Sequence, residues 1–339
     1  MEKELRIVKS PSALSPAWDE LAVSLFQKRA FLNHLHRFNP CNQRYYELHQ
    51  NDIIVSGAVV YTLRTDLFTF SGIKSPMKMR VIGLPVSVAT ESVIGSPEHY
   101  ACLLEGIVGK ENGLILGINF MQHHSLPFKA RWTRTLPTVV MPLHASTFEA
   151  YLQSLRHPYR RHILNVQKRF AGVTKVTNNC RFFTPAHYDQ YLQIMRRTKT
   201  KLETLSFECF SHLPANFRLT TYFTGNQMLC WHIVCRANNT LIFYFGGMNY
   251  ALNKQYASYQ NLLLDILLLA IEEGCRTVEF GQTAETAKQY LGGELSERAL
   301  FLYHRNPVIS GFIKLFKPLI GYRRPPMEYR VFKKIQIPE

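Results

Sequence analysis

The sequence lacks the features that mark several large classes of protein. No C-x-x-C pair occurs among its seven cysteines, so the usual zinc and dithiol motifs are missing. The longest strongly apolar run, residues 262–271, is interrupted by Asp265 and reaches about half of the ~20 residues that a membrane-spanning helix needs. A Walker loop, a Rossmann glycine pattern and a signal-peptide core are also missing. We therefore expect no metal site, and scattered cysteines favour a cytoplasmic location.

Carboxylates are scarce in this chain. There are 24 Asp and Glu residues against 40 Lys and Arg residues, which gives a formal net charge of +16. Such a basic protein either carries many solvated surface cations or binds a polyanion, namely RNA, an anionic membrane surface or a phosphate-rich cofactor. Charge alone does not choose among these partners.

The order of predicted elements indicates a mixed α/β fold in two parts. A length of 339 residues favours two domains. Residues 44–61 read as a hairpin whose turn is Asn51-Asp52, and a helix of high apolar content covers residues 259–273 before Gly274. Strands followed by strand–helix–strand predict mixed, mostly antiparallel sheets flanked by helices. We expect lobes at residues 1–146 and 147–306, followed by a basic amphipathic extension at 307–339.

A basic helix is predicted where the second lobe opens. Residues 156–170 read RHPYRRHILNVQKRF, and Tyr159, Ile163, Val166 and Phe170 fall on one apolar face. Arg161, Asn165 and Lys168 fall on the opposite face. This polar face is either solvated or a binding surface for phosphate or carboxylate, because the planar fork of arginine binds oxyanions with two hydrogen bonds.

The stretch FGQTAETAKQYLGGEL, residues 280–295, has an unusual composition for a connection. It places Gly281, Gln282 and Thr283 at the end of an apolar strand, and a lone Lys288 in a short helix. A glycine pair, Gly292-Gly293, follows. A solvated lysine and a glycine helix stop are the plain structural interpretation. A pocket for an acyl donor or acceptor is the functional one.

Residues 147–306 together resemble the C-terminal half of the Fem-type peptidyl transferases, a branch of the GNAT acyltransferase superfamily. The resemblance rests on a strand that ends in aromatics and glycine, a Tyr/Asn-rich loop, an apolar helix, and a strand that ends F-G-x-[ST] before a Lys and a glycine. These positions are Tyr244, Gly246, Gly247, Tyr256, Asn261, Phe280, Gly281, Gln282, Thr283, Lys288, Leu291 and Gly292. The resemblance implies two tandem GNAT-like lobes and an N-acyltransferase acting on an amine.

The donor is left open between a coenzyme A thioester and aminoacyl-tRNA. GNAT enzymes that use coenzyme A usually have a glycine-rich loop before the apolar helix, whose N–H groups bind pyrophosphate. Here residues 248–258 read MNYALNKQYAS, without glycine. Fem-type enzymes that use aminoacyl-tRNA also lack that loop in their second lobe, so its absence does not exclude transfer chemistry, and the resemblance leaves tRNA as one candidate partner.

The candidate residues have separate expected roles in amide formation, which needs a neutral amine, a polarised carbonyl and their alignment. Lys288 would neutralise a phosphate or hold a carboxylate, and Gln282 would orient a carbonyl. Tyr244 or Tyr303 would relay a proton to the leaving group. The predicted catalytic residues are Lys288, Gln282 and Tyr244, and the predicted substrate-binding residues are Arg161, Asn165, Lys168, Tyr256, Asn261, Gly281, Thr283 and Tyr303.

The C-terminal segment 307–324, PVISGFIKLFKPLIGYRR, combines apolar and basic residues. It is either a packed closing helix or an interfacial helix that contacts an anionic membrane from the cytoplasmic side. A function from a different class also fits the sequence, namely a GNAT scaffold without catalysis that binds RNA or anionic lipid.

Overall fold

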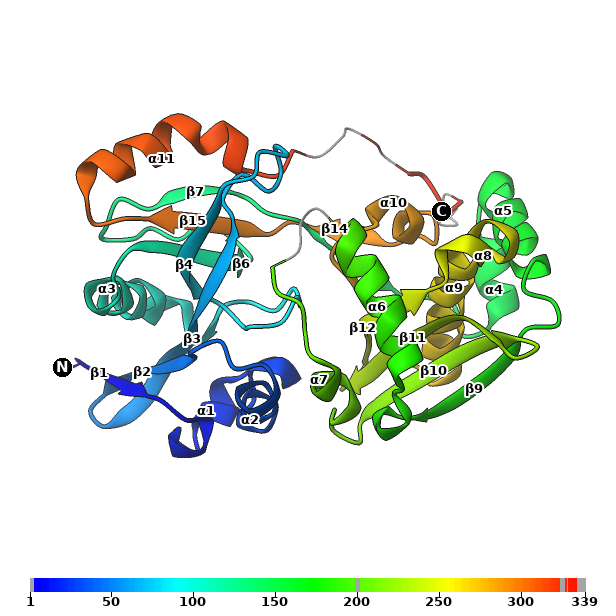
Figure 1. Cartoon of the computed structure of the whole chain (residues 1–339), viewed down its shortest axis with the longest axis horizontal. Coiled ribbons are helices and arrows are strands. Elements are labelled where there is room, and N and C mark those ends of the chain that lie inside the picture. Colours follow the sequence, from blue (N-terminus) through cyan, green and yellow to red (C-terminus); the bar gives the residue numbers. More distant parts are fainter. Residues whose placement is uncertain (1–2, 199–201, 324–326, 328, 334–339) are drawn as a thin grey trace, which may run out of the picture. The chain divides into compact units, whose positions relative to one another are not determined.

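The chain folds into two compact units. The computed structural model describes residues 3–198, 202–323, 327 and 329–333. The first unit comprises Met1–Leu136, Thr198–Cys209 and Glu297–Arg324, and the second comprises Pro137–Arg197, Phe210–Ser296 and Pro325–Glu339. Each unit has one large sheet (Figure 1).

The sheet of the first unit has eight strands and is mostly antiparallel. Its order is β1-β2-β3-β4-β6-β15-β7, with β5 paired to β3, and only β4 and β6 run parallel. The strands are β1 (Lys3–Val8), β2 (Arg44–Gln50), β3 (Ile53–Asp66), β4 (Pro76–Ile82), β5 (Val93–Gly95), β6 (Leu114–Phe120), β7 (Arg131–Arg134) and β15 (Ala299–Tyr303).

Helices cover both faces of this sheet. The helical segments are η1 (Pro11–Ala13), α1 (Trp18–Leu21), η2 (Leu25–Gln27), α2 (Arg29–Phe38), η3 (Pro97–His99), α3 (Tyr100–Lys110) and α11 (Pro307–Ile320). Leu103, Leu104 and Ile107 of α3 pack against one face. Ile313 and Ile320 of α11 pack against the other. Because both faces of the central strands are covered, the residues that point to either face are buried, and these strands are apolar almost throughout.

The second unit repeats this plan with a seven-stranded sheet. Its order is β14-β8-β13-β12-β11-β10-β9, and only β12 and β13 run parallel. The strands are β8 (Thr138–Pro142), β9 (Thr174–Asn179), β10 (Phe217–Thr224), β11 (Gln227–Ala237), β12 (Thr240–Met248), β13 (Thr277–Gly281) and β14 (Glu294–Ser296). The helical segments around it are α4 (Phe148–Ser154), α5 (His157–Lys168), η4 (Cys180–Phe182), α6 (Pro185–Arg197), α8 (Tyr250–Tyr256), α9 (Ser258–Glu272) and α10 (Glu285–Gln289). A further helix, α7 (Phe207–Ser211), spans the boundary between the units.

The fold class predicted from the sequence is confirmed, and so is the hairpin of β2 and β3. Its two turn residues, Asn51 and Asp52, have φ of 51° and 62°, the left-handed values that a tight hairpin turn requires. Within the described part of the chain, no helix is long and apolar enough to cross a membrane.

The chain passes between the units at places that differ from the expected boundaries. The predicted boundary at residue 146 falls after β8, but β8 pairs with β13 and β14 and therefore belongs to the second sheet. The strand β15, expected in the second lobe, pairs with β6 and β7 of the first sheet. Part of the C-terminal extension returns to the second unit, where Val331 is buried.

Candidate active site

The strands β12 and β13 pair over only part of their length. Their parallel register runs from Thr240↔Thr277 to Ile242↔Glu279 and ends there. Directly beyond that point both strands carry a bulge, with Tyr244 as the extra residue in β12 and Phe280 in β13. Bulges redirect side chains and end ladder pairing, and they are frequent beside active sites. Main-chain groups of β12 beyond Ile242 therefore have no ladder partner on the β13 side.

Lys288 is a buried side chain that contacts the turn after β13. It lies on α10 with only 1% of its surface exposed, and its Nζ donates to Gly281 O at 3.0 Å and to Gln282 O at 2.7 Å. Burial lowers the pKa of Lys288 to about 7, although Glu285 and Glu279 act in the opposite direction. The solvated lysine considered from the sequence is wrong, because Lys288 is an internal donor that holds the turn after β13.

The turn that Lys288 holds is conformationally unusual. Gly281, Thr283 and Ala284 have φ of 70°, 62° and 48°. Left-handed φ suits glycine, but it costs a β-branched residue such as Thr283 of order 1 kcal/mol or more. Strain of this kind persists where the surroundings fix the backbone, and the Lys288 hydrogen bonds supply that constraint. Such outliers gather at functional sites, which motivates a functional hypothesis for this turn.

The glycine pair after α10 allows close packing. A Cβ on Gly293 would lie 2.5 Å from Val139 Cγ1, and one on Gly292, which has φ of 100°, would lie 2.4 Å from the Phe332 ring. Gly292 and Gly293 therefore let β8 and the C-terminal segment approach the carboxyl end of α10. They do more than end a helix.

Three of the predicted residues cluster with Lys288. Gly281, Gln282 and Thr283 form the turn itself, with Gln282 half-buried and Thr283 exposed. An added Cβ on Gly281 would lie 3.8 Å from Phe243 O, so β12 is in contact distance of the turn. Tyr244, the residue after Phe243, is buried with its ring centroid 5.2 Å from that of Phe217 and 4.7 Å from that of Phe245.

The basic helix does not join this cluster. Arg161, Asn165 and Lys168 are exposed on the outer face of α5, whereas Ile163 and Val166 are buried beneath it, as the spacing predicts. A groove lined jointly by Lys288 and these three side chains was expected. Because Lys288 is buried and bound to the main chain, it does not present its amine on the exposed surface of α5.

The remaining predicted residues have structural contacts. Asn261 is buried on α9, and its Nδ2 donates to Val166 O at 2.9 Å and to Tyr256 O at 3.0 Å, which ties α5 to α9. The Tyr256 hydroxyl lies 3.3 Å from Thr224 Oγ1. Tyr303 lies on β15 in the first unit, with its ring 4.9 Å from that of Phe128.

The start of α9 is closed by a side chain of the preceding helix. The Tyr259 N–H donates to Asn253 Oδ1 at 3.0 Å, and Ala257 takes the left-handed conformation at φ 49°. A first-turn N–H that could bind an oxyanion is thus already satisfied. The residues here do not form the glycine cradle that pyrophosphate binding uses.

Sequence reasoning missed a partly buried polar network between β9, β10, β11 and α9. The Tyr222 hydroxyl donates to Asp265 Oδ2 at 2.6 Å, and Lys175 Nζ lies 2.7 Å from Asp265 Oδ1. His232 Nδ1 lies 3.3 Å from the same hydroxyl, and burial lowers the pKa of His232 to about 4. Asp265 is the residue that interrupts the apolar run of α9, and that interruption was the available signal.

The residue that follows α10 connects this helix to α5 through aromatic rings. The Tyr290 ring centroid lies 5.5 Å from that of Tyr159 and 5.4 Å from that of His162. Among the described residues, no group of three His, Cys, Asp or Glu side chains could hold a metal ion.

Comparison with known proteins places the chain among the acyltransferase folds. Residues 159–289 match the family model described as acetyltransferase (GNAT) domain. The structure of FemX is similar with a TM-score of 0.55 and 11% identity, covering 93% of this chain and 100% of that one. A tandem GNAT protein from the clavulanic acid biosynthesis pathway has a TM-score of 0.52 and 12% identity, covering 90% and 99%.

A third similar structure is the C-terminal domain of a proposed lysylphosphatidylglycerol synthetase from Agrobacterium fabrum, with a TM-score of 0.50 and 9% identity over 81% of this chain and 88% of that one. No curated protein matches the chain in sequence. The matched residues run from α5 to α10 and so contain the β12–α9–β13 segment and the turn at Lys288. Residues 159–289 thus match a GNAT acetyltransferase domain, and the fold of the chain is similar to the folds of FemX and of the tandem GNAT protein.

Proposed function

We propose that this protein transfers an acyl or aminoacyl group from an activated donor to an amine, and that the reaction takes place beside the turn after β13. The observation that carries the proposal is the buried Lys288, which fixes the carbonyls of Gly281 and Gln282 next to the point where β12 and β13 stop pairing. The GNAT match over residues 159–289 supports the same reaction class.

The proposed reaction forms an N–C bond and breaks the C–O bond of an ester or the C–S bond of a thioester. The proton of the attacking amine passes to the leaving oxygen or sulfur. Main-chain N–H groups of β12 beyond Ile242 are candidates to polarise the donor carbonyl, because ladder pairing does not occupy them on the β13 side. We assign the proton transfer to Tyr244 and the orientation of the carbonyl to Gln282. Lys288 is a positioning residue, since its known contacts are main-chain carbonyls.

Aminoacyl-tRNA is the donor that we favour over coenzyme A. Asn253 already occupies the Tyr259 N–H at the start of α9, where a pyrophosphate would bind. The exposed face of α5 offers Arg161 and Lys168 as phosphate contacts, with Asn165 between them. From Arg156 to Lys175 there is no carboxylate to oppose them.

A salt titration of charged tRNA binding tests this donor. Each phosphate contact that is lost should reduce the slope of log K against log salt by roughly 0.7–0.9. We expect Arg161→Ala/Lys168→Ala to reduce the slope, and Lys28→Ala/Lys110→Ala, which removes two exposed lysines from the first unit, to leave it nearly unchanged. Equal slopes for the two double variants would exclude α5 as the tRNA surface.

Transfer itself is tested with Lys288→Met against Lys254→Met, which removes an exposed lysine from α8. Each variant is incubated with amine-bearing extract fractions and with either labelled aminoacyl-tRNA or labelled acyl coenzyme A. The labelled product is then separated from the donor and counted. We expect Lys288→Met to lose most of the activity and Lys254→Met to retain it. Undiminished turnover in a folded Lys288→Met variant contradicts the assignment.

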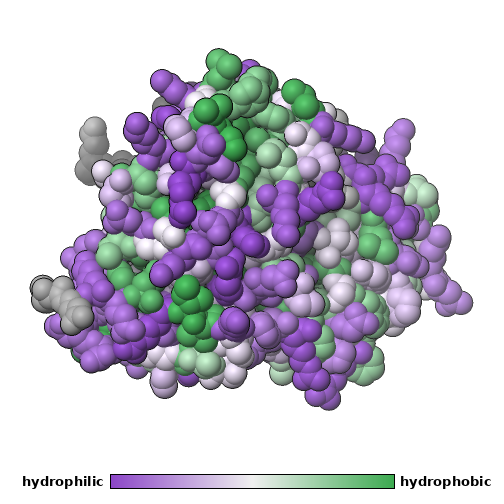
Figure 2. Space-filling view, turned by 60° about the vertical axis from the view of Figure 1, so that its left-hand side comes forward, coloured by the Kyte–Doolittle hydropathy of each residue, from purple (hydrophilic) through white to green (hydrophobic). Residues whose placement is uncertain are grey.

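A second candidate function, binding of anionic lipid, is favoured by the surface of α11. Val308, Phe312 and Leu315 are 77%, 61% and 71% exposed and lie at i, i+4 and i+7 on one line of the helix. Figure 2 shows hydrophobic side chains at the top of the molecule in that view. Lys314 and Lys317 are also exposed and lie together on one side of the line, between it and the buried Ile313, and basic residues near an apolar stripe favour anionic membrane surfaces.

Sedimentation with anionic vesicles separates this candidate from a packed closing helix. Ending the chain at Asn306 would also remove Ile313 and Ile320 from the core, so a surface variant is the sharper test. Phe312→Ser/Leu315→Ser should lose vesicle binding while the free energy of unfolding stays within about 1 kcal/mol of the original. Unchanged sedimentation removes the membrane contact. Vesicle binding without any transfer would favour the scaffold without catalysis.

A further inference from the structure

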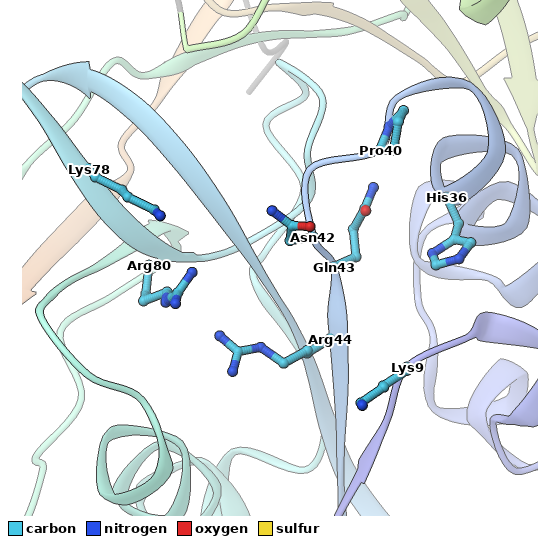
Figure 3. A pocket seen from close by; sticks show the side chains of 8 residues that line it. All are labelled: Lys9, His36, Pro40, Asn42, Gln43, Arg44, Lys78 and Arg80. Atoms are coloured by element: carbon cyan, nitrogen blue, oxygen red, sulfur yellow. The ribbon is translucent and has the colours of Figure 1, made fainter.

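A cavity in the first unit carries an excess of positive charge. It has a volume of about 510 Å³. The lining residues are Lys9, His36, Pro40, Asn42, Gln43, Arg44, Lys78 and Arg80, which come from the end of β1, from α2 and the loop after it, and from β2 and β4. Figure 3 shows the head groups of Lys78, Arg80, Arg44 and Lys9 turned toward one space.

Four cationic side chains line this cavity, and two of them pair with one buried carboxylate. Glu111, which follows α3, is buried and forms ion pairs with both Arg44 and Arg80, and it accepts a hydrogen bond from the Tyr46 hydroxyl at 2.5 Å. Lys9 and Lys78 form no ion pair or hydrogen bond with any side chain in the part of the chain that the structure describes. The buried carboxylate therefore balances only part of the charge that faces the cavity.

The arginine pair is held in place before any ligand arrives. Arg80 Nη1 donates to Thr62 Oγ1, and its Nε lies 3.4 Å from Glu111 Oε2. Arg44 Nη2 donates to the same carboxylate oxygen. Fixed guanidinium groups lose little freedom on binding, which raises affinity for a ligand of matching geometry.

The opposite wall is also fixed by hydrogen bonds. Gln43 Nε2 donates to Asn39 O at 2.7 Å, and Gln43 Oε1 accepts from Cys41 N at 2.9 Å. Asn39 Nδ2 in turn donates to Pro85 O at 2.6 Å. The loop between α2 and β2 is therefore a built wall rather than a loose surface segment. If these cations served only to pair with Glu111 in the folded structure, one arginine would be enough, and neither Lys9 nor Lys78 would be needed.

We propose that this cavity binds a phosphorylated small molecule through its phosphate group or groups. Arginine forks match the geometry of phosphate oxygens, and the two lysines supply further point charges. A cavity of this size lies within the ~300–1,000 Å³ that small-molecule sites occupy, so the ligand extends beyond the phosphate. The concave shape favours a small molecule over RNA. This site is independent of the transfer reaction proposed for the second unit.

Calorimetric titration of the whole protein at low salt tests the site with inorganic pyrophosphate, inorganic phosphate and adenosine diphosphate. We expect pyrophosphate to bind, and Lys9→Ala/Lys78→Ala to weaken that binding by about tenfold or more. These lysines make no ion pair among the described residues, so the variant should fold normally. Lys3→Ala/Lys129→Ala, two exposed lysines of the same unit outside the cavity, is the charge-matched control. Arg44→Lys keeps the charge but loses the fork and should also weaken binding.

The results of this titration distinguish a nucleotide from recognition of the phosphates alone, and a small molecule from RNA. Tighter binding of adenosine diphosphate than of pyrophosphate supports a nucleotide, and equal binding supports recognition of the phosphates alone. The absence of pyrophosphate binding at millimolar concentration would overturn the proposal, and so would equal weakening by the cavity variant and its control. Displacement of pyrophosphate by total tRNA, with the same dependence on Lys9 and Lys78, would replace the small molecule with RNA.

Discussion

Replacing Lys288 by methionine should change how the stability of the protein depends on pH. Lys288 is 1% exposed, and its ordinary pKa of 10.5 falls to about 7 because burial disfavours the charged amine. Methionine fills a similar volume and cannot ionise. The substitution therefore removes a titrating group and two hydrogen bonds without leaving a large cavity.

The sign and size of the effect follow from proton linkage. Below pH 7 both the folded and the unfolded chain hold the proton, and the folded chain bears the full cost of the buried cation. Between pH 7 and 10.5 the unfolded chain keeps a proton that the folded chain has released, so stability rises with pH. At about 1.4 kcal/mol per pH unit, the gain between about pH 7 and 9 is roughly 2 kcal/mol.

Urea unfolding at several pH values measures this gain. The free energy of unfolding of the original protein should rise relative to Lys288→Met by roughly 2 kcal/mol between about pH 7 and 9. The Lys254→Met variant lacks an exposed lysine on α8 and should follow the original protein throughout. Parallel curves for the original protein and Lys288→Met would refute the burial of a lysine with a lowered pKa.

Four further substitutions test the second unit by urea unfolding. Gly247→Ala would place a Cβ 2.2 Å from Trp231 Nε1 and should cost about 1–3 kcal/mol; an unchanged midpoint would contradict the packing. Asn261→Ala removes the hydrogen bonds between α5 and α9 and should cost about 1–3 kcal/mol. Thr283→Gly relieves a left-handed φ and should stabilise by up to about 1 kcal/mol, so a clear loss would argue against strain. Asn253→Ala frees the Tyr259 N–H and should cost about 1 kcal/mol; tight coenzyme A binding by the original protein would contradict its capped helix start.

Local patterns in the sequence predicted the elements whose periodicity is strong. The apolar face of α5 was visible in its spacing, and Ile163 and Val166 are buried as that spacing requires. The hairpin of β2 and β3 was visible because Asn51 and Asp52 adopt the backbone conformation that a tight turn needs. In each case the decisive interactions lie within a few residues along the chain.

The exchange of strands between the units could not be predicted in the same way. β8 and β15 are short, and either sheet would accept them on composition alone. Their partners lie far along the chain, since Val139 pairs with Gly281 and Phe301 with Gly117. The packing around α10 has the same origin, because Val139 of β8 lies against Gly293, and the helix pattern around the buried Lys288 does not contain that contact.

The separation of the basic surface from the buried turn constrains the ligand of the second unit. Arg161 is exposed on α5, whereas Lys288 of α10 is buried. Tyr290, which follows α10, connects the two helices through its contact with the His162 ring. A compact substrate that touches the turn would leave the α5 cations unused. A donor that carries its phosphates at a distance from its reactive carbonyl would engage both, and aminoacyl-tRNA and acyl coenzyme A share that geometry. The placement of these side chains therefore fits both donors, and our preference for aminoacyl-tRNA rests on the capped start of α9.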